Sequence, residues 1–322
     1  MFYNPYENIY DKELEWQKVN LHIHAGICIK DVCGEFPMRE VIDAYAQAGY
    51  NAIAVTNHDC FVSCEERDDI SLLDGVEFTR NQHLLLIGTK YNENLSAQEL
   101  HDKMNSSYAE FFSGEYGSAS VDYQKVIDQA RKSGAFVILC HPNWQRREFF
   151  PLETMKQLTG YIGIEILNTG IYNVNNWGSG YALAVDLWDE LLTSGKKVYG
   201  FGNDDFHYWR DLDNVCNMIC AKSAAYEDIF EAVTTGRFYV STGLELERFD
   251  YDGIKLTVQA KLAIPSYIDT FEYRIIGSGG KLLYQSTGKD IAYRINDSEL
   301  YARVEVTGPN GEKLYTQPII KD

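Results

Sequence analysis

Between residues 18 and 240, short apolar runs alternate with amphipathic helical patterns, and this alternation constrains the fold more than any other feature. It is typical of repeated strand-helix units that build a parallel sheet. The clearest units are 19–25 followed by 37–49, 121–134 followed by 135–140, and 181–195 followed by 196–202. The three helical patterns close at Gly49, Gly134 and Gly195, which suits the left-handed residue after a helix. We therefore expect an α/β fold.

After Gly243 the pattern changes to short β-prone runs separated by turn signals such as Ser-Gly-Gly and Pro-Asn-Gly. The runs are 255–262, 270–277, 281–287, 302–308 and 313–320. We therefore predict two domains: an α/β domain over residues 1–243, and a small antiparallel β-sandwich, Ig-like, over residues 244–322. A chain of 322 residues is long enough for one large and one small core. The polar stretch 92–120 reads as an insertion that could cap a cleft.

The charge balance limits the partners that the chain can take. A net charge of −18 repels nucleic-acid backbones and anionic membranes, so neither a nucleic-acid polymer nor a membrane is expected as a partner. A small anionic substrate stays compatible, because bound divalent cations would reverse the field inside their own cleft. The polar, acidic N-terminal stretch is unlike a secretory signal, and no apolar run is long enough to span a bilayer, which predicts a cytoplasmic protein.

Seven cysteines are an odd count in a chain of this length, so reduced thiols are the better expectation than a complete disulfide framework. One alternative stays open for four of them. Cys28, Cys33, Cys60 and Cys64 could form a structural zinc site if their two loops are neighbours, although a C-x2-C spacing would be a stronger signal.

Six of the seven histidines, all but His101, fall at predicted strand ends, a preference that scattered core or surface histidines would not show. They and the carboxylates placed in the same way are His22, His24, His58, Glu77, His83, His141, Asp205 and His207. Residues two apart on a strand point to the same face, so the H-x-H pair can reach one cation. The same spacing aims Asp205 and His207 together and Asp204 to the opposite side.

Two further features bring the remaining groups to the same rim. Glu77 closes the short run in DGVEFT and His83 opens HLLLIG, so a tight reversal between them would make the two neighbours. His141 directly follows the apolar run AFVILC and precedes Pro142. Mixed imidazole and carboxylate ligands suit Mn²⁺, Fe²⁺ and Zn²⁺, and one carboxylate can bridge two cations. The inventory predicts a centre of two or three divalent metal ions.

The motifs LHIH, TNHD, GVE, the histidine before LLLIG, CHP and DFH, in this order, resemble the PHP family, the polymerase and histidinol phosphatase superfamily. The likeness spans about residues 18–245. It implies a distorted (β/α)7 TIM-like barrel that holds two or three metals, usually manganese, iron or zinc, and that hydrolyses phosphate esters.

The resemblance also implies a ligand set, carried over by position. His22, His24, Glu77 and Asp205 would bind a first metal, Glu77, His83 and His141 a second, and His58 with His207 a third. Glu77 would be the bridge, and Glu77, Asp205 and His207 would carry the catalysis.

Two positions depart from the family pattern. Asn57 stands where the family usually has Asp, and a neutral amide there weakens any charge behind the ligands, although Asp59 could partly compensate. The loop after the H-x-H pair places Asp31 before Gly34 at a longer spacing than usual. Either Asp31 or Glu35 could therefore complete the third metal site, and Asp31 is the residue that we predict.

The predicted reaction is hydrolysis of a small phosphate ester, a phosphomonoester or a nucleotide-like compound, by a hydroxide that bridges two metals and attacks phosphorus. Four residues near the rim could bind this substrate: Arg146, Arg147, Arg210 and Asn168. Two alternatives stay open. The run GRFYVSTG and the ending TQPII also resemble a bacterial branch that includes carboxylester hydrolases acting on carbamates, so a carboxylester, carbamate or amide could be the substrate. The other is a metal-binding module without catalysis.

Overall fold

The computed structural model describes residues 2–26, 36–59, 67–88, 112–113, 120–170, 182–267 and 269–321. It is a mixed α/β structure, as the alternating pattern predicts, and its strands before residue 242 fall mainly into two sheets. The bounds of these strands are β2 (Glu15–Ile23), β3 (Ala52–Val55), β4 (Ser71–Leu73), β5 (Gly75–Thr79), β6 (His83–Ile87), β9 (Phe136–Leu139), β10 (Gly163–Asn168), β11 (Tyr199–Asn203), β12 (Cys216–Ala221) and β13 (Phe238–Ser241).

The first sheet has five strands in the order β11-β10-β9-β6-β5. Strands β9, β10 and β11 are parallel, whereas β6 is antiparallel to both β5 and β9. The second sheet contains β2, β3 and β4, which are parallel, and β12 and β13, which join it antiparallel. Single parallel bridges link the two sheets, from Ile23 at the end of β2 to Phe206 and from His58, just after β3, to Glu77.

Helices connect the strands and bury one face each. Their bounds are α1 (Met38–Gln47), α3 (Tyr123–Lys132), α4 (Leu152–Gln157), α6 (Val185–Thr193), α7 (Tyr226–Thr234) and the short 3-10 helix η2 (Trp209–Asp211). The carboxylate of Asp122 caps α3 by accepting the N–H of Lys125. The predicted helix stops are confirmed, because Gly49, Gly134 and Gly195 have φ of 81°, 89° and 88°.

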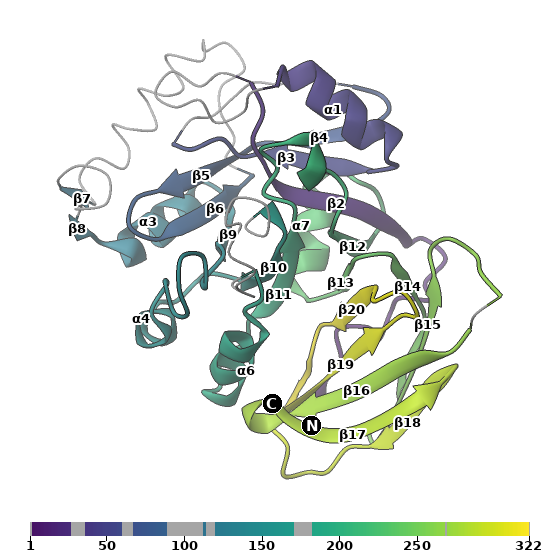
Figure 1. Ribbon diagram of the computed structural model, residues 1–322. Helices are drawn as coiled ribbons and strands as arrows, with labels where there is room; N and C mark the ends of the chain where they lie inside the picture. The colour runs from purple at the N-terminus through teal and green to yellow at the C-terminus, as the bar shows by residue number, and fades with distance from the viewer. Residues whose placement is uncertain are drawn as a thin grey trace.

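The C-terminal strands form two antiparallel layers that share one core. Their bounds are β14 (Leu244–Tyr251), β15 (Lys255–Leu262), β16 (Phe271–Gly277), β17 (Lys281–Gly288), β18 (Asp290–Arg294), β19 (Tyr301–Thr307), β20 (Lys313–Thr316) and β21 (Ile319–Lys321), with the 3-10 turn η3 (Ser278–Gly280). Phe249 and Val258 of β14 and β15 pack with Tyr273 and Val304 of β16 and β19. Figure 1 shows these strands, in light green to yellow, grouped beside the α/β part.

One sheet crosses the predicted boundary at residue 243, which stays a prediction. β13 pairs antiparallel with β20, and β12 joins β13 to β2, so the sheet that contains β2 runs on into the C-terminal strands. At its far end β1 (Phe2–Tyr3) pairs with β21. The hydrogen-bonded ladder is therefore shared between the two parts of the chain.

A buried ion pair also joins the two parts. Asp189 of α6 accepts hydrogen bonds from Nε and one terminal nitrogen of Arg303 at 2.8 and 2.7 Å, and from the hydroxyl of Tyr301 at 2.8 Å. Arg303 is only 1% exposed and also contacts Glu305 at 2.7 Å. The guanidinium is therefore paired on both sides, as a buried charge must be.

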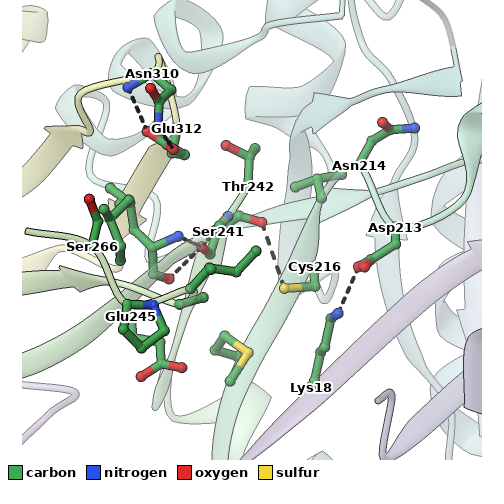
Figure 2. A pocket seen from close by; sticks show the side chains of 18 residues that line it. Lys18, Asp213, Asn214, Cys216, Ser241, Thr242, Glu245, Ser266, Asn310 and Glu312 are labelled. Atoms are coloured by element: carbon green, nitrogen blue, oxygen red, sulfur yellow. Dashed lines mark hydrogen bonds and ion pairs between the residues drawn. The ribbon is translucent and has the colours of Figure 1, made fainter. Parts of the chain in front are cut away.

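A pocket of about 680 Å³ opens at the same junction (Figure 2). Its charged side chains are paired with neighbouring residues. Lys18 forms an ion pair with Asp213 at 2.7 Å, and Glu312 accepts hydrogen bonds from Asn310 at 2.9 and 3.0 Å. None of the described residues predicted for the metal centre lines this pocket. The candidate site lies elsewhere.

Some sequence predictions fall outside the described residues. These are Cys28, Cys33, Cys60 and Cys64, and most of the predicted insertion, of which only β7 (Phe112–Ser113) and the start of β8 (Ser120–Val121) are described. The three described cysteines, Cys140, Cys216 and Cys220, are buried free thiols. Among the described helices, none is both long enough and apolar enough to cross a bilayer.

Candidate metal centre

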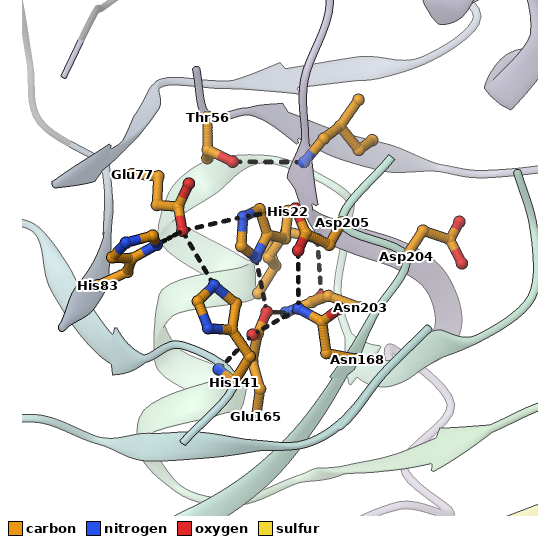
Figure 3. A network of polar contacts seen from close by, with 12 residues as sticks. His22, Thr56, Glu77, His83, His141, Glu165, Asn168, Asn203, Asp204 and Asp205 are labelled. Carbon is orange, nitrogen blue, oxygen red and sulfur yellow. Dashed lines mark hydrogen bonds and ion pairs between the residues drawn. The ribbon is translucent and has the colours of Figure 1, made fainter. Parts of the chain in front are cut away.

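The predicted ligands gather where the ends of β2 and β3 meet β5, β6 and the segment after β11 (Figure 3). His22 is the last but one residue of β2, and His24 directly follows the strand. A backbone hydrogen bond of 3.0 Å from His24 to Phe206 holds this end of β2 beside the segment that follows β11. Asp205 in that segment therefore faces both histidines.

Two imidazoles and a carboxylate form a first cluster. Nε2 of His22 and Nε2 of His24 are 3.1 Å apart, and Oδ1 of Asp205 is 3.1 Å from each. The two oxygens of Glu77 lie 3.5 Å from these nitrogens, Oε1 from His22 and Oε2 from His24. Ligands about 2.1 Å from one cation stand about 3.0 to 3.4 Å from each other, so this spacing fits a shared cation.

Glu77 also belongs to a second cluster. The hairpin β5–β6 pairs Thr79 with His83, which is the predicted reversal, but Glu77 lies at the middle of β5 and does not end it. Its Oε1 is 2.7 Å from Nδ1 of His83 and 3.2 Å from Nε2 of His141, and its Oε2 is 2.6 Å from Nδ1 of His58. The carboxylate thus stands between two sets of imidazoles.

A third group, His24, His58 and His207, places one ring nitrogen of each within 4.8 Å of the others. The side chains of His58 and His207 are 22% and 27% exposed, whereas those of His22 and His24 are fully buried. Asp211 in η2 holds the His207 backbone by accepting its N–H at 3.1 Å. The cluster therefore opens to solvent on the side of this third group.

Buried charge dominates the electrostatics of the cluster. Burial alone would raise the pKa of Glu77, but the surrounding imidazoles, led by His58, hold this pKa well below its ordinary value. Burial would likewise raise the pKa of Asp205, but the imidazoles, led by His22, hold this pKa well below its usual range. Burial, aided by the neighbouring imidazoles, lowers the pKa of His24. Burial would also lower the pKa of His22, but the carboxylates around it, led by Asp205, raise this pKa well above its ordinary value. A metal ion requires ionised carboxylates and neutral imidazoles, so it would displace the proton that this ring holds.

Glu165, at the centre of β10, supports the ligands from behind. It is fully buried, and its Oε1 lies 2.8 Å from Nδ1 of His22. Its Oε2 accepts the backbone N–H of His141 at 2.8 Å, and Asn168 and Asn203 donate to the two oxygens at 2.9 Å. A proton held on Nδ1 of His22 leaves Nε2 directed at the cluster, as supporting carboxylates do behind metal-binding histidines.

The backbone is strained at three residues around the centre. Asp59, His141 and Asp205 have φ of 49°, 22° and 49°, a region that residues other than glycine rarely adopt. Each such conformation costs on the order of 1–3 kcal/mol and is maintained only where the surroundings demand it. Gly170 packs so closely that a Cβ there would come within 2.4 Å of the Asp205 carbonyl oxygen. The close contact with Gly170 therefore restricts the course of the backbone at Asp205.

The two departures from the family pattern have different outcomes. The carboxamide of Asn57 donates to the Ala25 carbonyl at 2.8 Å and accepts the Ala25 N–H at 3.0 Å, a pair of bonds that a carboxylate cannot make. Asp59 accepts the N–H of Thr79 at 2.9 Å and pairs with Arg80. Asn57 therefore joins two strand ends. Asp31 and Glu35 lie outside the described residues.

The residues predicted to bind substrate are spread more widely. Arg146, Arg147 and Arg210 are exposed, and Arg147 pairs with Asp186 at 3.1 Å on the surface. Arg210 stacks over the ring of Tyr208 at 4.8 Å. Asn168 is fully buried and donates to Glu165 and, at 3.2 Å, to Asp205. Asn168 thus contacts two carboxylates of the centre, whereas the three arginines lie at the surface.

Sequence reasoning did not single out Asn203 or Arg80. Asn203 ends β11 and joins Glu165 to the backbone N–H of Leu21 through its two carboxamide atoms, at 2.9 and 3.0 Å. Arg80 directly follows the Glu77 strand. The position of Asn203 just before the two aspartates at a strand end was the available signal, because parallel strand ends share one rim.

The donor set fits divalent cations such as Mn²⁺, Fe²⁺ or Zn²⁺. Buried imidazole nitrogens and carboxylate oxygens lie close enough to share ions, and the described carboxylates around them, Glu77, Glu165 and Asp205, have histidines as their ion-pair partners. Three buried negative charges with imidazoles as counter-groups call for a bound cation or for protons.

A comparison with solved structures finds the same architecture elsewhere. A two-domain protein containing a predicted PHP-like metal-dependent phosphoesterase, from Bacteroides vulgatus, matches 95% of this chain over 96% of its own, with 17% identity and a TM-score of 0.50. The chain therefore shares the overall fold of that protein. The match covers the α/β part and the C-terminal strands alike.

Other comparisons add little to the PHP-like match. A β-glucuronidase from Ruminococcus gnavus matches 26% of this chain and 16% of its own, with 13% identity and a TM-score of 0.18. No family model matches the sequence, and no curated protein matches it.

Proposed function

We propose that this chain is a metal-dependent hydrolase that cleaves a small phosphate ester at the cluster around Glu77. The observation that carries the proposal is the Glu77 carboxylate, which stands between buried imidazoles on both of its oxygens. The PHP-like fold, found in a protein described as a predicted metal-dependent phosphoesterase, supports it. In this proposal the reaction is the hydrolysis of a phosphoester, and the substrate is a small molecule.

The chain's own residues would hold the cations and orient the imidazoles that bind them. His22, His24, Glu77 and Asp205 would hold one cation, Glu77 with His83 and His141 a second, and His58 with His207 a third. Bound cations would supply the Lewis acidity that activates water and neutralises charge on the ester. Glu165 keeps a proton on Nδ1 of His22, and the Asp205 carbonyl oxygen, 2.9 Å from Nδ1 of His207, would do the same there, so that each ring turns Nε2 towards a cation.

We also propose that the two sheets are the halves of a distorted seven-stranded barrel. The bridges from Ile23 to Phe206 and from His58 to Glu77 support this, because they place β2 beside β11 and β3 beside β5. With these contacts the strands follow the closed order β2-β3-β5-β6-β9-β10-β11. In this proposal residues 1–243 are the catalytic domain and residues 244–322 the β-sandwich.

A carboxylester, carbamate or amide hydrolase is the second candidate. The exposed position of the predicted phosphate-binding arginines favours it, because Arg147 is engaged with Asp186 and Arg146 is exposed, beside the ring of Phe149. A phosphate is normally held by guanidinium groups directed at it, whereas a neutral ester does not require them.

The test combines metal analysis of the purified protein with a substrate panel assayed with added Mn²⁺, Fe²⁺ or Zn²⁺. Metal-dependent release of phosphate from phosphomonoesters or nucleotides is the expected result. Release of p-nitrophenol from carboxylate esters or carbamates alone would favour the second candidate. Bound metal without turnover on either set would indicate a binding module, and failure to bind any of these metals would refute the proposal.

A further inference from the structure

Strand β11, which leads to Asp205, is completed on one edge by side chains. It pairs with β10 on the other edge, where Tyr199 donates to Ile162 at 2.9 Å. Among the described residues no second strand pairs with it. The alternate residues Gly200 and Gly202 therefore direct their N–H and C=O groups away from β10, towards the sheet that contains β12, β13 and β20.

Two buried carboxamides satisfy these groups as a neighbouring strand would. Gln317, which follows β20, accepts the Gly200 N–H at 2.9 Å and donates to the Gly200 carbonyl at 2.7 Å. Asn217 of β12 does the same for Gly202, at 3.0 and 2.8 Å. Both side chains are fully buried, so losing either one would leave a backbone donor and acceptor unsatisfied inside the protein.

The strand has little freedom to take another position. A Cβ on Gly200 would come within 2.8 Å of Ile166, and one on Gly202 within 2.3 Å of Val240. The face of the strand towards which a Cβ would point is therefore closely packed at both glycines, and the two carboxamides hold the edge of the strand.

The same contacts continue to the metal centre. Asn217 also donates to Oδ1 of Asn203 at 3.1 Å, and Asn203 donates to Glu165, the residue behind His22. Asp205 lies two residues beyond the end of β11. The register of β11 therefore determines both where Asp205 meets the histidines and where Glu165 is held.

We propose that Gln317 is a positioning residue for the metal centre: through its two bonds to Gly200, the C-terminal tail holds β11 in the register that brings Asp205 to His22 and His24. This gives the C-terminal strands a role in the site without any direct contact with it. The proposal rests on the proposed metal centre.

The experiment compares full-length wild type with Gln317→Ala and with a matched control, Thr316→Val. Thr316 is the preceding residue, is equally buried, and its hydroxyl accepts only the N–H of Val304 within the C-terminal strands. The readouts are the melting temperature of the metal-free protein, the affinity and visible spectrum of Co²⁺ binding, and hydrogen exchange in a peptide covering β11.

Both substitutions should lower the melting temperature, because each removes buried hydrogen bonds. Only Gln317→Ala should weaken Co²⁺ binding, by about tenfold, as is usual for partners behind metal ligands, with a changed spectrum and faster exchange in β11. Equal Co²⁺ affinity and spectrum in the two variants would overturn the proposal. If Gln317→Ala does not fold, Gln317→Asn, whose carboxamide is one methylene short of Gly200, is judged by the same criteria. A wild type that binds no Co²⁺ would instead refute the metal centre itself.

Discussion

Two of the places where the molecule buries charge differ in how that charge is balanced. At the junction between the parts, Asp189 is paired with the guanidinium of Arg303 and the hydroxyl of Tyr301. At the centre, Glu77 and Asp205 face imidazoles, whose charge depends on protons or on a bound ion. The first arrangement is complete within the chain and helps to hold the two parts together. The second is completed only by protons or by a bound ion, and a metal ion is the partner that we propose.

The sharpest test of the second arrangement is Glu77→Gln. The amide keeps the shape of the side chain but lacks the charge and one acceptor, so it cannot serve two imidazole clusters at once. Hydrolytic turnover should fall on the order of a thousandfold or more, equivalent to at least about 4 kcal/mol of activation free energy. The measurement is kcat/KM on the substrate that the panel identifies, with Glu312→Gln in the junction pocket as the control. Turnover within a few fold of wild type would remove Glu77 from the mechanism.

The first arrangement is tested by Arg303→Met. This substitution leaves the Asp189 carboxylate buried without its cation, and breaking a buried pair in this way costs about 3–5 kcal/mol of unfolding free energy. Urea denaturation measures the loss. Arg274→Met is the matched control, since Arg274 pairs with the same Glu305 but is 41% exposed, and an exposed pair contributes about 0–1 kcal/mol. Equal losses in the two variants would show that burial does not distinguish these pairs.

Removal of metal should separate the two regions directly. A chelator should lower the melting temperature of wild type, because an ion present at about 100 times its dissociation constant contributes about 2.7 kcal/mol to the folded state. The same chelator should leave the melting temperature of Glu77→Gln nearly unchanged. Differential scanning calorimetry with and without EDTA checks both, and a wild type indifferent to EDTA would contradict a metal-filled cluster.

The smallest expected effect is that of Glu165→Gln. The amide should disturb the proton on Nδ1 of His22 and weaken metal binding by about 10- to 100-fold, while the fold persists. Isothermal titration of the metal-free protein with Zn²⁺ measures the affinity. Glu305→Gln, which perturbs the junction, should leave that affinity unchanged. If the two variants bind Zn²⁺ equally well, Glu165 does not orient His22.

The sequence was informative where one local pattern decides the structure. The H-x-H spacing placed His22 and His24 on one face, and the short separation of Glu77 from His83 predicted the hairpin that brings them together. The alternating pattern alone predicts parallel strands, so the antiparallel pairing of β12 with β2 and with β13 did not follow from it. β14 was also missed, because a bulge between Leu246 and Arg248 breaks its two-residue period.

Long-range contacts of neutral side chains were beyond the reach of the sequence. Gln317 and Gly200 are 117 positions apart, and a single glutamine after a strand carries no signal of its partner. Asn57 looked like a weakened metal-site residue, and only the structure shows that its carboxamide joins two strand ends. Side chains that bind a backbone leave no periodic pattern, whereas charged and imidazole groups at strand ends do.

The ladder between β13 and β20 has a consequence for how the protein comes apart. If the two parts separated, β13 and β20 would each lose a neighbouring strand. Their unpaired N–H and C=O groups would then form an exposed edge, at which other chains can pair. Heat should therefore melt the whole molecule in a single cooperative transition. Either part expressed alone should aggregate, because it would carry such an unpaired strand.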